Sequence, residues 1–230
     1  MRIIGLIGGM SWESSLEYYR IINEQVKEKL GGLHSATSLM FSVDFDEIEK
    51  LQHQGNWKEA TKIMIDAAIR LEKGGADFVV ICTNTMHKMY NDVQDKIKIP
   101  ILHIADATAE KIKVKGLNKI GLLGTKFTME EDFYKGRLIE KYGFDVIIPN
   151  EKDRQVIHNV IYHELCLGKI NQFSKDQFIK IINKLVDNGA EAVILGCTEI
   201  SLLIQQRDVN VILFDTTRIH AETAVEYALK

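Results

Sequence analysis

Residues 74–85 read GGADFVVICTNT, which combines a glycine pair that can stop a helix, a short apolar strand and a polar strand end. When the sequence is shifted by 114 positions, residues 188–199 repeat this pattern as NGAEAVILGCTE. Residues 4–8, IGLIG, are matched at a shift of 116 by residues 120–124, IGLLG. Any two βα units share some apolar spacing, but here glycine and acidic positions coincide as well, which favours two related α/β units.

The rest of the chain alternates expected strands with expected helices. The expected strands are residues 3–7, 36–43, 77–82, 101–104, 119–123, 145–148, 192–195 and 211–214. The expected helices begin near residues 12, 56, 85, 128, 153 and 175, another ends at residue 115, and a last one ends the chain. This rhythm predicts parallel sheets covered on both sides, with ligands beyond the carboxyl ends of the strands. On the first helix, four apolar residues recur every three or four positions, and this helical spacing predicts that they belong to the core. They are Leu16, Tyr19, Ile22 and Val26.

The composition is that of an ordinary folded protein. The 230 residues carry a net charge of −3 and are 46% hydrophobic, so no basic face is available for nucleic acid. The longest apolar runs have the length of buried strands, far below the roughly 20 residues that span a bilayer. Three cysteines without a C-x-x-C pair fit reduced thiols better than disulfides or a zinc site. We therefore expect a cytoplasmic protein with no membrane, nucleic-acid or metal partner.

Polar side chains follow the two repeated strands where each strand ends. Cys197 lies between a glycine and Thr198, before an expected helix whose dipole would lower the pKa of the thiol. Asn84, Thr85 and Thr198 could donate hydrogen bonds to a carboxylate, and Glu199 could orient them. The alternatives are an inert buried thiol and simple helix capping.

Three motifs of this chain resemble the cofactor-independent aspartate/glutamate racemase family. They are IGLIGGMSWES at residues 4–14, CTNTMH at residues 82–87 and GCTEI at residues 196–200. The resemblance extends over essentially the whole chain and is strongest to the bacterial broad-specificity or L-Asp/Glu racemases. It implies an isomerase that acts on a small amino acid, uses no cofactor or metal, and forms a homodimer.

The resemblance also implies a domain organisation and a mechanism. We expect two pseudo-symmetric α/β domains, residues 1–103 with 212–230 and residues 104–211, each a mostly parallel sheet flanked by helices. The active site would lie in the cleft between them. Two opposed acid/base residues, Thr83 and Cys197, would remove the α-proton from one face of the substrate and return it on the other.

The chain departs from the family pattern at Thr83, where typical aspartate racemases have a second cysteine. Cys82 is adjacent, but the internal repeat pairs Thr83 with Cys197, and neighbours on a strand point to opposite faces. We therefore expect Cys82 to be a core residue, although a twisted strand end could present it instead. Because a hydroxyl is a weaker acid than a thiol, the departure predicts slower proton exchange on that face.

Substrate recognition is less specific in the sequence. Met10 matches the family's backbone donor position, and Gln52 falls where a side-chain contact is expected. Related aspartate racemases often have basic residues in the regions of Ile48 and Glu164, and neither is basic here. A distal carboxylate would then bind weakly, which favours a tolerant pocket or a contact from Gln52, Thr125 or another residue.

Two alternative functions remain open from the sequence. A decarboxylase or maleate-isomerase-like enzyme of the same fold would use one cysteine as proton donor or nucleophile. A non-catalytic amino-acid-binding protein would keep the carboxylate contacts and lose turnover with Thr83. The glycines at 5, 8 and 9 do not have G-x-G-x-x-G spacing, so a nucleotide site is not expected.

Overall fold

The computed structural model describes residues 1–230 and divides into two compact units. Unit 1 comprises Met1–Ile104 and His220–Lys230, and unit 2 comprises Ala105–Ile219. Each unit contains its own parallel sheet of four strands, so the expected fold class of two α/β domains is confirmed.

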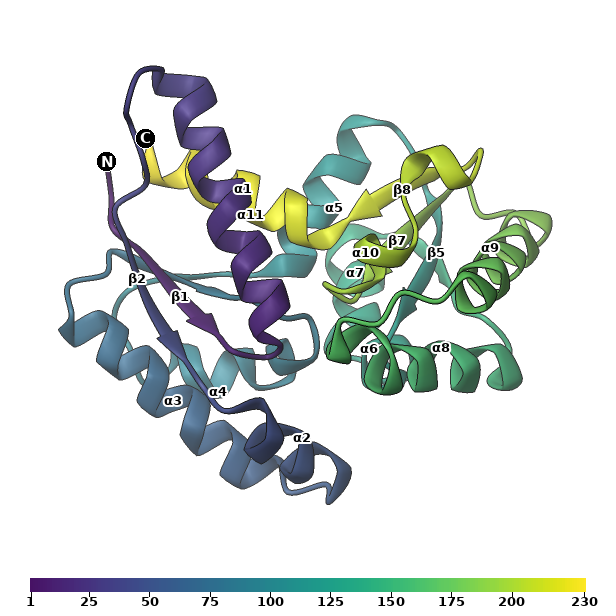
Figure 1. Cartoon of the computed structure of the whole chain (residues 1–230), viewed down its shortest axis with the longest axis horizontal. Coiled ribbons are helices and arrows are strands. Elements are labelled where there is room, and N and C mark those ends of the chain that lie inside the picture. Colours follow the sequence, from purple (N-terminus) through teal and green to yellow (C-terminus); the bar gives the residue numbers. More distant parts are fainter. The chain divides into compact units, whose positions relative to one another are not determined.

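Unit 1 has the strand order β2-β1-β3-β4. Figure 1 labels β1 and β2, which lie side by side in this sheet. Its strands are β1 (Ile4–Gly8), β2 (Ser38–Ser42), β3 (Phe78–Ile81) and β4 (Ile101–Leu102). Its helices are α1 (Trp12–Leu30), α2 (Phe45–His53), α3 (Trp57–Lys73), the 3-10 helix η1 (Thr85–Met89) and α4 (Tyr90–Gln94). The last helix of the chain, α11 (Thr216–Ala228), ends in this unit.

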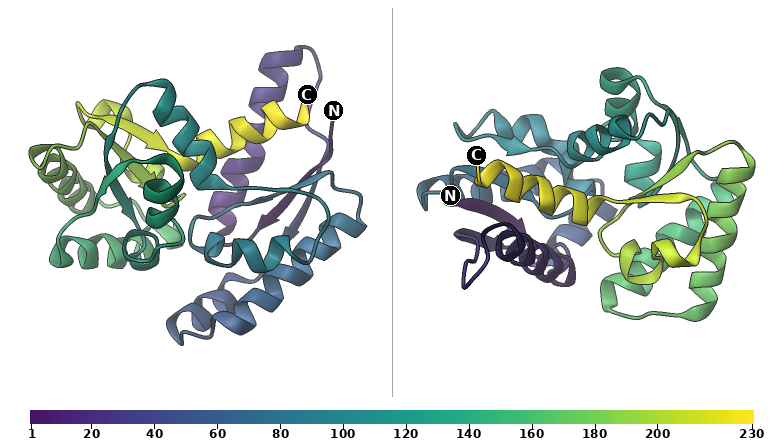
Figure 2. Two further views of the ribbon diagram at one scale, coloured as in Figure 1. Left: turned by 180° about the vertical axis from the view of Figure 1, so that it is seen from behind. Right: turned by 90° about the horizontal axis from the view of Figure 1, so that it is seen from above.

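The sheet of unit 1 is buried on both faces. Successive side chains of each strand point to opposite faces, and helices cover both of them. Ile7, Val79 and Ile81 pack in one apolar cluster with residues of α3. Leu6 and Val80 pack in a second cluster with residues of α1 and α11. Figures 1 and 2 show α1 and α3 on opposite faces of this sheet. The buried strands thus act as the rigid base from which their polar carboxyl ends project.

Unit 2 has the strand order β6-β5-β7-β8. Its strands are β5 (Lys119–Gly124), β6 (Asp145–Ile147), β7 (Ala192–Gly196) and β8 (Ile212–Asp215). Its helices are α5 (Ile104–Val114), α6 (Lys126–Glu130), α7 (Lys135–Tyr142), α8 (Glu151–His163), α9 (Gln172–Asp187) and α10 (Ile200–Leu203). Two short 3-10 helices, η2 (Leu165–Leu167) and η3 (Gln206–Asp208), complete it.

The two sheets have the same topology. β1 and β5 each lie between the strand that follows them in sequence and the third strand of their unit. β3 and β7 each pair in parallel with both of their neighbours, β3 with β1 and β4, and β7 with β5 and β8. The repeats found in the sequence are therefore topologically equivalent strands, and Thr83 and Cys197 follow equivalent strand ends.

The boundary between the units differs from the expected one near residue 212. β8 pairs with β7 in the sheet of unit 2, with Phe214 opposite Ile194, so Ile212–Asp215 cannot belong to the first domain. The chain returns to unit 1 only within α11. There the Arg2 N–H donates to the Ala228 C=O at 2.9 Å, and the two chain ends lie side by side (Figure 2).

Several local expectations also need correction. Helix α2 was not expected, and the helix expected from Thr85 is the 3-10 helix η1 followed by the short α4. Thr125, and not Thr128, caps α6, with its Oγ1 accepting from the Thr128 N–H at 3.3 Å. These segments are short and polar, and tertiary contacts rather than periodicity decide their conformation.

The expected core stripe on α1 is only half correct. Ile22 and Val26 are buried, but Leu16 is 55% and Tyr19 51% exposed. The helix contacts the sheet through the adjacent face that carries Tyr18 and Ile21. Helical spacing identified an apolar stripe on α1, but the way in which the helix packs on the sheet determines which of these side chains are buried. None of the helices is both long enough and apolar enough to cross a bilayer.

A fully buried histidine links α11 to the rest of unit 1. His220 Nδ1 lies 2.9 Å from the Tyr18 hydroxyl, and its Nε2 lies 2.9 Å from the Leu102 C=O. Because a carbonyl only accepts, Nε2 carries the proton and the Tyr18 O–H donates to Nδ1. Burial, with a smaller contribution from His87, lowers the pKa of His220 from 6.5 to about 3. The ring therefore stays neutral in the folded protein.

This pKa shift predicts loss of stability in acid. The stabilisation from neutral His220 is fully present above pH 6.5 and is lost as pH falls from there towards about 3. We expect the free energy of unfolding to fall by up to ~1.4 kcal/mol per pH unit in this window. Urea unfolding at a series of pH values measures the slope. His220→Gln, which cannot titrate, should have a smaller slope, and an unchanged slope would contradict the assignment.

Candidate active site

The end of β3 separates a core cysteine from the candidate catalytic threonine. Cys82 is fully buried in the apolar cluster with Tyr18 and Phe78, and burial raises the pKa of its thiol. This confirms the expectation that Cys82 is a core residue. Thr83 is partly exposed, whereas Asn84 and Thr85, which follow it, are buried. Of the two neighbours, Thr83 is the one that a ligand could reach.

The glycine loop after β1 reaches the end of β3. The Ser14 hydroxyl lies within hydrogen-bond distance of the Cys82 C=O, at 3.2 Å, and Met10 is buried in the loop that precedes α1. Gly9 has a φ of +92°, and a Cβ there would overlap the carbonyl oxygen of Val43. The loop therefore packs tightly on the chain after β2. A side chain at position 9 would push Met10 out of place.

Gln52 is brought to the same strand end by α2. The side chain is buried, and its Nε2 lies 3.1 Å from the Met86 sulfur in η1. Ile48, one turn earlier on α2, is fully buried in the apolar cluster that also holds Met10 and Met86. Position 48 is thus a core position, so it supplies no side-chain contact to a distal carboxylate.

In unit 2, Cys197 begins a polar segment directly after β7. The thiol is buried and lies 3.0 Å from Glu199 Oε2, to which it donates. The Thr198 hydroxyl donates to the same oxygen at 2.7 Å. Three buried polar side chains in succession are therefore joined through one carboxylate oxygen.

The electrostatics at Cys197 differ from the sequence-based expectation. The pKa of the thiol is raised well above its usual value, first by burial and then by the negative charge of Glu199 and by Cys166. The expected lowering by a helix dipole is wrong because α10 is only four residues long, Ile200–Leu203. Cys197 therefore carries its proton near neutral pH, and the charge of Glu199 adds to the effect of burial.

Thr125 lies beside Cys197 at the edge of the sheet. β5 and β7 end in register, with Gly124 opposite Gly196, so Thr125 and Cys197 are each the first residue beyond the sheet. A Cβ on Gly124 would come within 2.7 Å of the Gly196 C=O. The two glycines thus allow the strand ends to approach closely, which brings a hydroxyl and a thiol to one edge.

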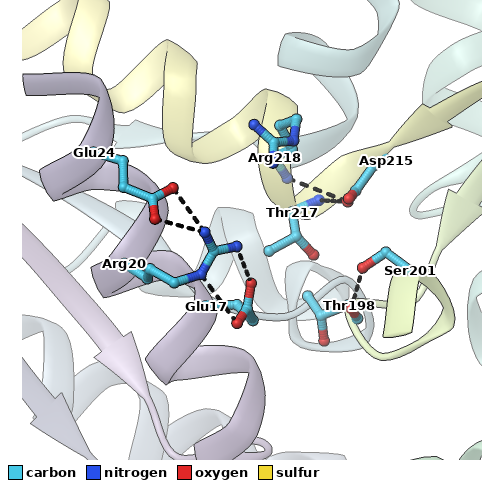
Figure 3. Close-up of polar contacts among 8 residues, drawn as sticks. All are labelled: Glu17, Arg20, Glu24, Thr198, Ser201, Asp215, Thr217 and Arg218. Carbon is cyan, nitrogen blue, oxygen red and sulfur yellow. Dashed lines mark hydrogen bonds and ion pairs between the residues drawn. The ribbon is translucent and has the colours of Figure 1, made fainter. Parts of the chain in front are cut away.

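Asp215 is a polar residue at the end of β8 that sequence reasoning missed. Its Oδ1 accepts from the N–H groups of Thr217 and Arg218 at 3.0 and 3.2 Å (Figure 3). Burial raises the pKa of Asp215 despite these donors. Figure 3 also shows the Ser201 hydroxyl, which donates to the Thr198 C=O at 3.2 Å. An acidic residue directly after the apolar run 211–214 was the signal that could have identified this cap.

Glu164 and Arg137 are each paired with another side chain of unit 2. Glu164 accepts from the Ser174 hydroxyl at 2.9 and 2.7 Å through its two oxygens, near the start of α9. Arg137 forms a bidentate ion pair with Asp106 at 2.6 and 2.7 Å. Lys126 is exposed. No group of three or more His, Cys, Asp or Glu side chains has a metal-binding arrangement.

Each unit therefore carries one half of the predicted set. Unit 1 brings Met10, Gln52 and the segment 83–85 to the ends of β1 and β3. Unit 2 brings Thr125 and the segment 197–199 to the ends of β5 and β7. A hydroxyl in one unit and a thiol in the other occupy equivalent places, which suits chemistry that needs two acid/base groups.

Known proteins resemble this chain over most or all of its length. The sequence profile described as Asp/Glu/hydantoin racemase matches residues 7–224. The crystal structure of a candidate Asp/Glu racemase from Yersinia pestis is 53% identical, with a TM-score of 0.93 and 100% of both chains covered. That of an aspartate racemase homologue from Pyrococcus horikoshii OT3 is 37% identical, with a TM-score of 0.86 and 100% of both chains covered. The broad specificity amino-acid racemase RacX of Bacillus subtilis is 26% identical over 170 residues, 73% of this chain and 71% of that protein.

Proposed function

The chain belongs to the Asp/Glu/hydantoin racemase family and is an amino-acid racemase, and we propose that it interconverts L- and D-aspartate, L- and D-glutamate or a wider range of amino acids without pyridoxal phosphate. Such an enzyme is an isomerase of class EC 5.1.1. The observation that carries the two-base assignment is the equivalence of Thr83 and Cys197, which directly follow the repeated strand regions in two sheets of identical topology.

In the proposed reaction, Thr83 and Cys197 act on opposite faces of the α-carbon. One group takes the α-proton, and the electron pair of the Cα–H bond stays on the substrate as a carbanion that is delocalised into the carboxylate. The other group then adds its own proton to the opposite face, which yields the other enantiomer. The two groups have exchanged protonation states, and solvent restores them.

Substrate binding is assigned to the buried polar groups around these two residues. Asn84, Thr85 and Thr198 are proposed to hold the α-carboxylate, because that anion needs several convergent donors. Met10, Gln52 and Thr125 are proposed to complete the pocket, Met10 through its backbone. Without a basic residue at positions 48 and 164, a tolerant pocket is favoured over one that requires a distal carboxylate.

Glu199 is proposed to bind the α-ammonium group. Its carboxylate is buried, and the donors Cys197 and Thr198 that reach its Oε2 are both neutral hydroxyl or thiol groups. A bound ammonium would offset the negative charge that helps keep the Cys197 pKa high. Substrate would thereby make the Cys197 proton easier to release at the moment when exchange is required.

A panel of amino acids in D2O tests the function. Incorporation of deuterium at Cα together with formation of the D-isomer from L-aspartate, L-glutamate or another amino acid supports the racemase. Release of carbon dioxide, or of fumarate from maleate, without change of configuration would show the other chemistries of this fold. Binding of an amino acid without exchange would show a binding protein.

We further propose that the chain forms a homodimer through an apolar face of unit 1. Trp12, Leu16 and Tyr19 of α1 and Met40 of the edge strand β2 are all exposed, and they help line a groove of about 400 Å³. Exposed apolar patches of this kind commonly mark protein contacts. A cytoplasmic location is also proposed, on the basis of three free cysteines.

Sedimentation equilibrium tests the dimer. The expected mass is twice the 26.2 kDa of one chain, and Leu16→Glu should shift the protein to the monomer because it places a charge in the groove. Leu33→Glu is the matched control, since Leu33 is fully exposed and lies outside the groove. A wild-type protein that sediments as a monomer at micromolar concentration would contradict the proposal.

A further inference from the structure

Three histidines that lie far apart in the sequence are buried together in unit 1. They are His87 in η1, His103 after β4 and His220 in α11. The ring centroids of His87 lie 4.6 Å from His103 and 5.8 Å from His220. Of the three, His87 is the one that the structure records in contact with the candidate catalytic threonine.

The ring of His87 bridges two backbone groups. Its Nδ1 lies 2.8 Å from the Thr83 C=O, and its Nε2 lies 3.2 Å from the Ile104 N. A carbonyl can only accept and a backbone N–H can only donate, so Nδ1 carries the hydrogen and Nε2 is the acceptor. The two contacts together fix the neutral ring in a single tautomer and orientation.

These contacts connect the catalytic segment to the point where the chain leaves unit 1. Thr83 follows the core residue Cys82, and the His87 N–H donates to the Asn84 C=O at 3.1 Å, which closes a tight turn. Ile104 is the last residue of unit 1 before the chain enters unit 2, and it begins α5. The His87 ring thus joins the Thr83 peptide to the start of α5.

A purely structural role would not require a histidine. A buried polar ring costs free energy unless both of its nitrogens form hydrogen bonds, whereas an apolar side chain fills the same space without that requirement. Holding a carbonyl from one side and an amide from the other needs a donor and an acceptor at a fixed separation, which a neutral imidazole supplies.

We propose that His87 is a positioning residue for the racemase reaction: by holding the Thr83 carbonyl against the start of α5, its ring fixes the direction of the Thr83 hydroxyl towards the α-carbon. The inference rests on the proposed two-base function, in which Thr83 exchanges the α-proton on one face. A displacement of about 1 Å at a reacting group can lower a rate by about 100-fold, so such a support has a measurable effect.

Two substitutions separate the two contacts of the ring. His87→Asn places an amide nitrogen near the position of Nδ1 and can still donate to the Thr83 C=O. His87→Gln extends one bond further and can accept from the Ile104 N–H, but it loses the donor to Thr83. We expect His87→Asn to keep kcat within about 3-fold and His87→Gln to lower kcat by about 10- to 100-fold, with KM changed by less than about 3-fold.

The decisive measurement is the primary deuterium isotope effect on kcat for 2-deuterated L- and D-glutamate, or aspartate if that is the better substrate. Thr83 accepts the α-proton of only one enantiomer. In the other direction Thr83 donates the proton that completes the reaction, so a misdirected Thr83 slows both directions. His87→Gln should therefore raise the isotope effect for the enantiomer whose α-proton Thr83 accepts. It should lower the isotope effect for the other enantiomer, because proton return rather than C–H cleavage then limits the rate. Thr83→Ser identifies which enantiomer this is. His220→Gln, an equally buried histidine without contact to the Thr83 carbonyl, is the control and should alter neither isotope effect.

The outcomes distinguish the inference from the proposed function beneath it. If Thr83→Ser raises one isotope effect and His87→Gln raises the same one, the positioning role is supported. If Thr83→Ser does so while His87→Gln changes both enantiomers equally or neither, His87 is only structural and the inference is overturned. If Thr83→Ser and Thr83→Ala leave racemisation intact, the assignment of Thr83 itself fails, and the role of His87 falls with it.

Discussion

Replacing Cys197 with alanine is expected to lower α-proton exchange by about 10³-fold or more. The thiol is the stronger of the two proposed acids, and general acid/base groups contribute roughly 10² to 10⁴ in rate. The threonine hydroxyl on the other face cannot perform both halves of the exchange. Deuterium incorporation at Cα, followed by NMR, measures the loss directly and is independent of product chirality.

Cys82→Ala is the matched control for this substitution. Cys82 is also a buried thiol close to a strand end, but it packs in the apolar cluster of unit 1. Its replacement should leave exchange within about 10-fold of wild type and lower stability by about 1–2 kcal/mol for the lost packing. If Cys82→Ala abolished exchange while Thr83→Ala left it intact, the internal repeat would have been read in the wrong register.

Replacing Glu199 with glutamine is expected to alter both binding and the pH profile. Loss of the proposed contact with the α-ammonium group should raise KM by about 10- to 100-fold, since hydrogen bonds to charged groups contribute roughly 1.5–3 kcal/mol. The negative charge of Glu199 also helps raise the pKa of Cys197. Without it, the thiolate forms at lower pH, and the ascending limb of kcat/KM should move to lower pH.

Glu164→Gln provides the comparison. Glu164 is another carboxylate of unit 2, and it accepts hydrogen bonds from Ser174. We expect that variant to keep the wild-type KM and the wild-type pH profile. An unchanged KM and an unmoved ascending limb in Glu199→Gln would remove Glu199 from the site. A limb that moved to higher pH would have the wrong sign for relief of like-charge repulsion.

The part of the candidate site that follows the repeated strands could be predicted from local sequence patterns. The end of a buried strand can be recognised in the sequence, because buried positions are apolar and the first positions that solvent reaches are polar. The repeat at residues 188–199 therefore points to Cys197 and to its proposed partner Thr83 without any knowledge of the packing. Asp215 and α2 were missed, since short polar segments have no periodicity of their own.

The pKa of the candidate thiol and the burial of individual side chains could not be predicted from such local patterns. The pKa of Cys197 depends on burial and on the carboxylate of Glu199, 3.0 Å from the sulfur, and the helix that was expected to lower it is a single turn. Leu16 and Tyr19 have the spacing of core residues, yet the packing of α1 leaves both of them exposed. Neither result follows from spacing along the chain.

The amino-acid sequence by itself determined the alternation of strands and helices, the two related units and the residues at the repeated strand ends. These depend on apolar periodicity and glycine stops, which act over a few residues. Only the tertiary structure decided that Ile212–Asp215 joins the second sheet and that His87, His103 and His220 meet in one cluster. Both depend on contacts between residues remote in the chain, such as His220 with Leu102, and no local pattern encodes such a distance.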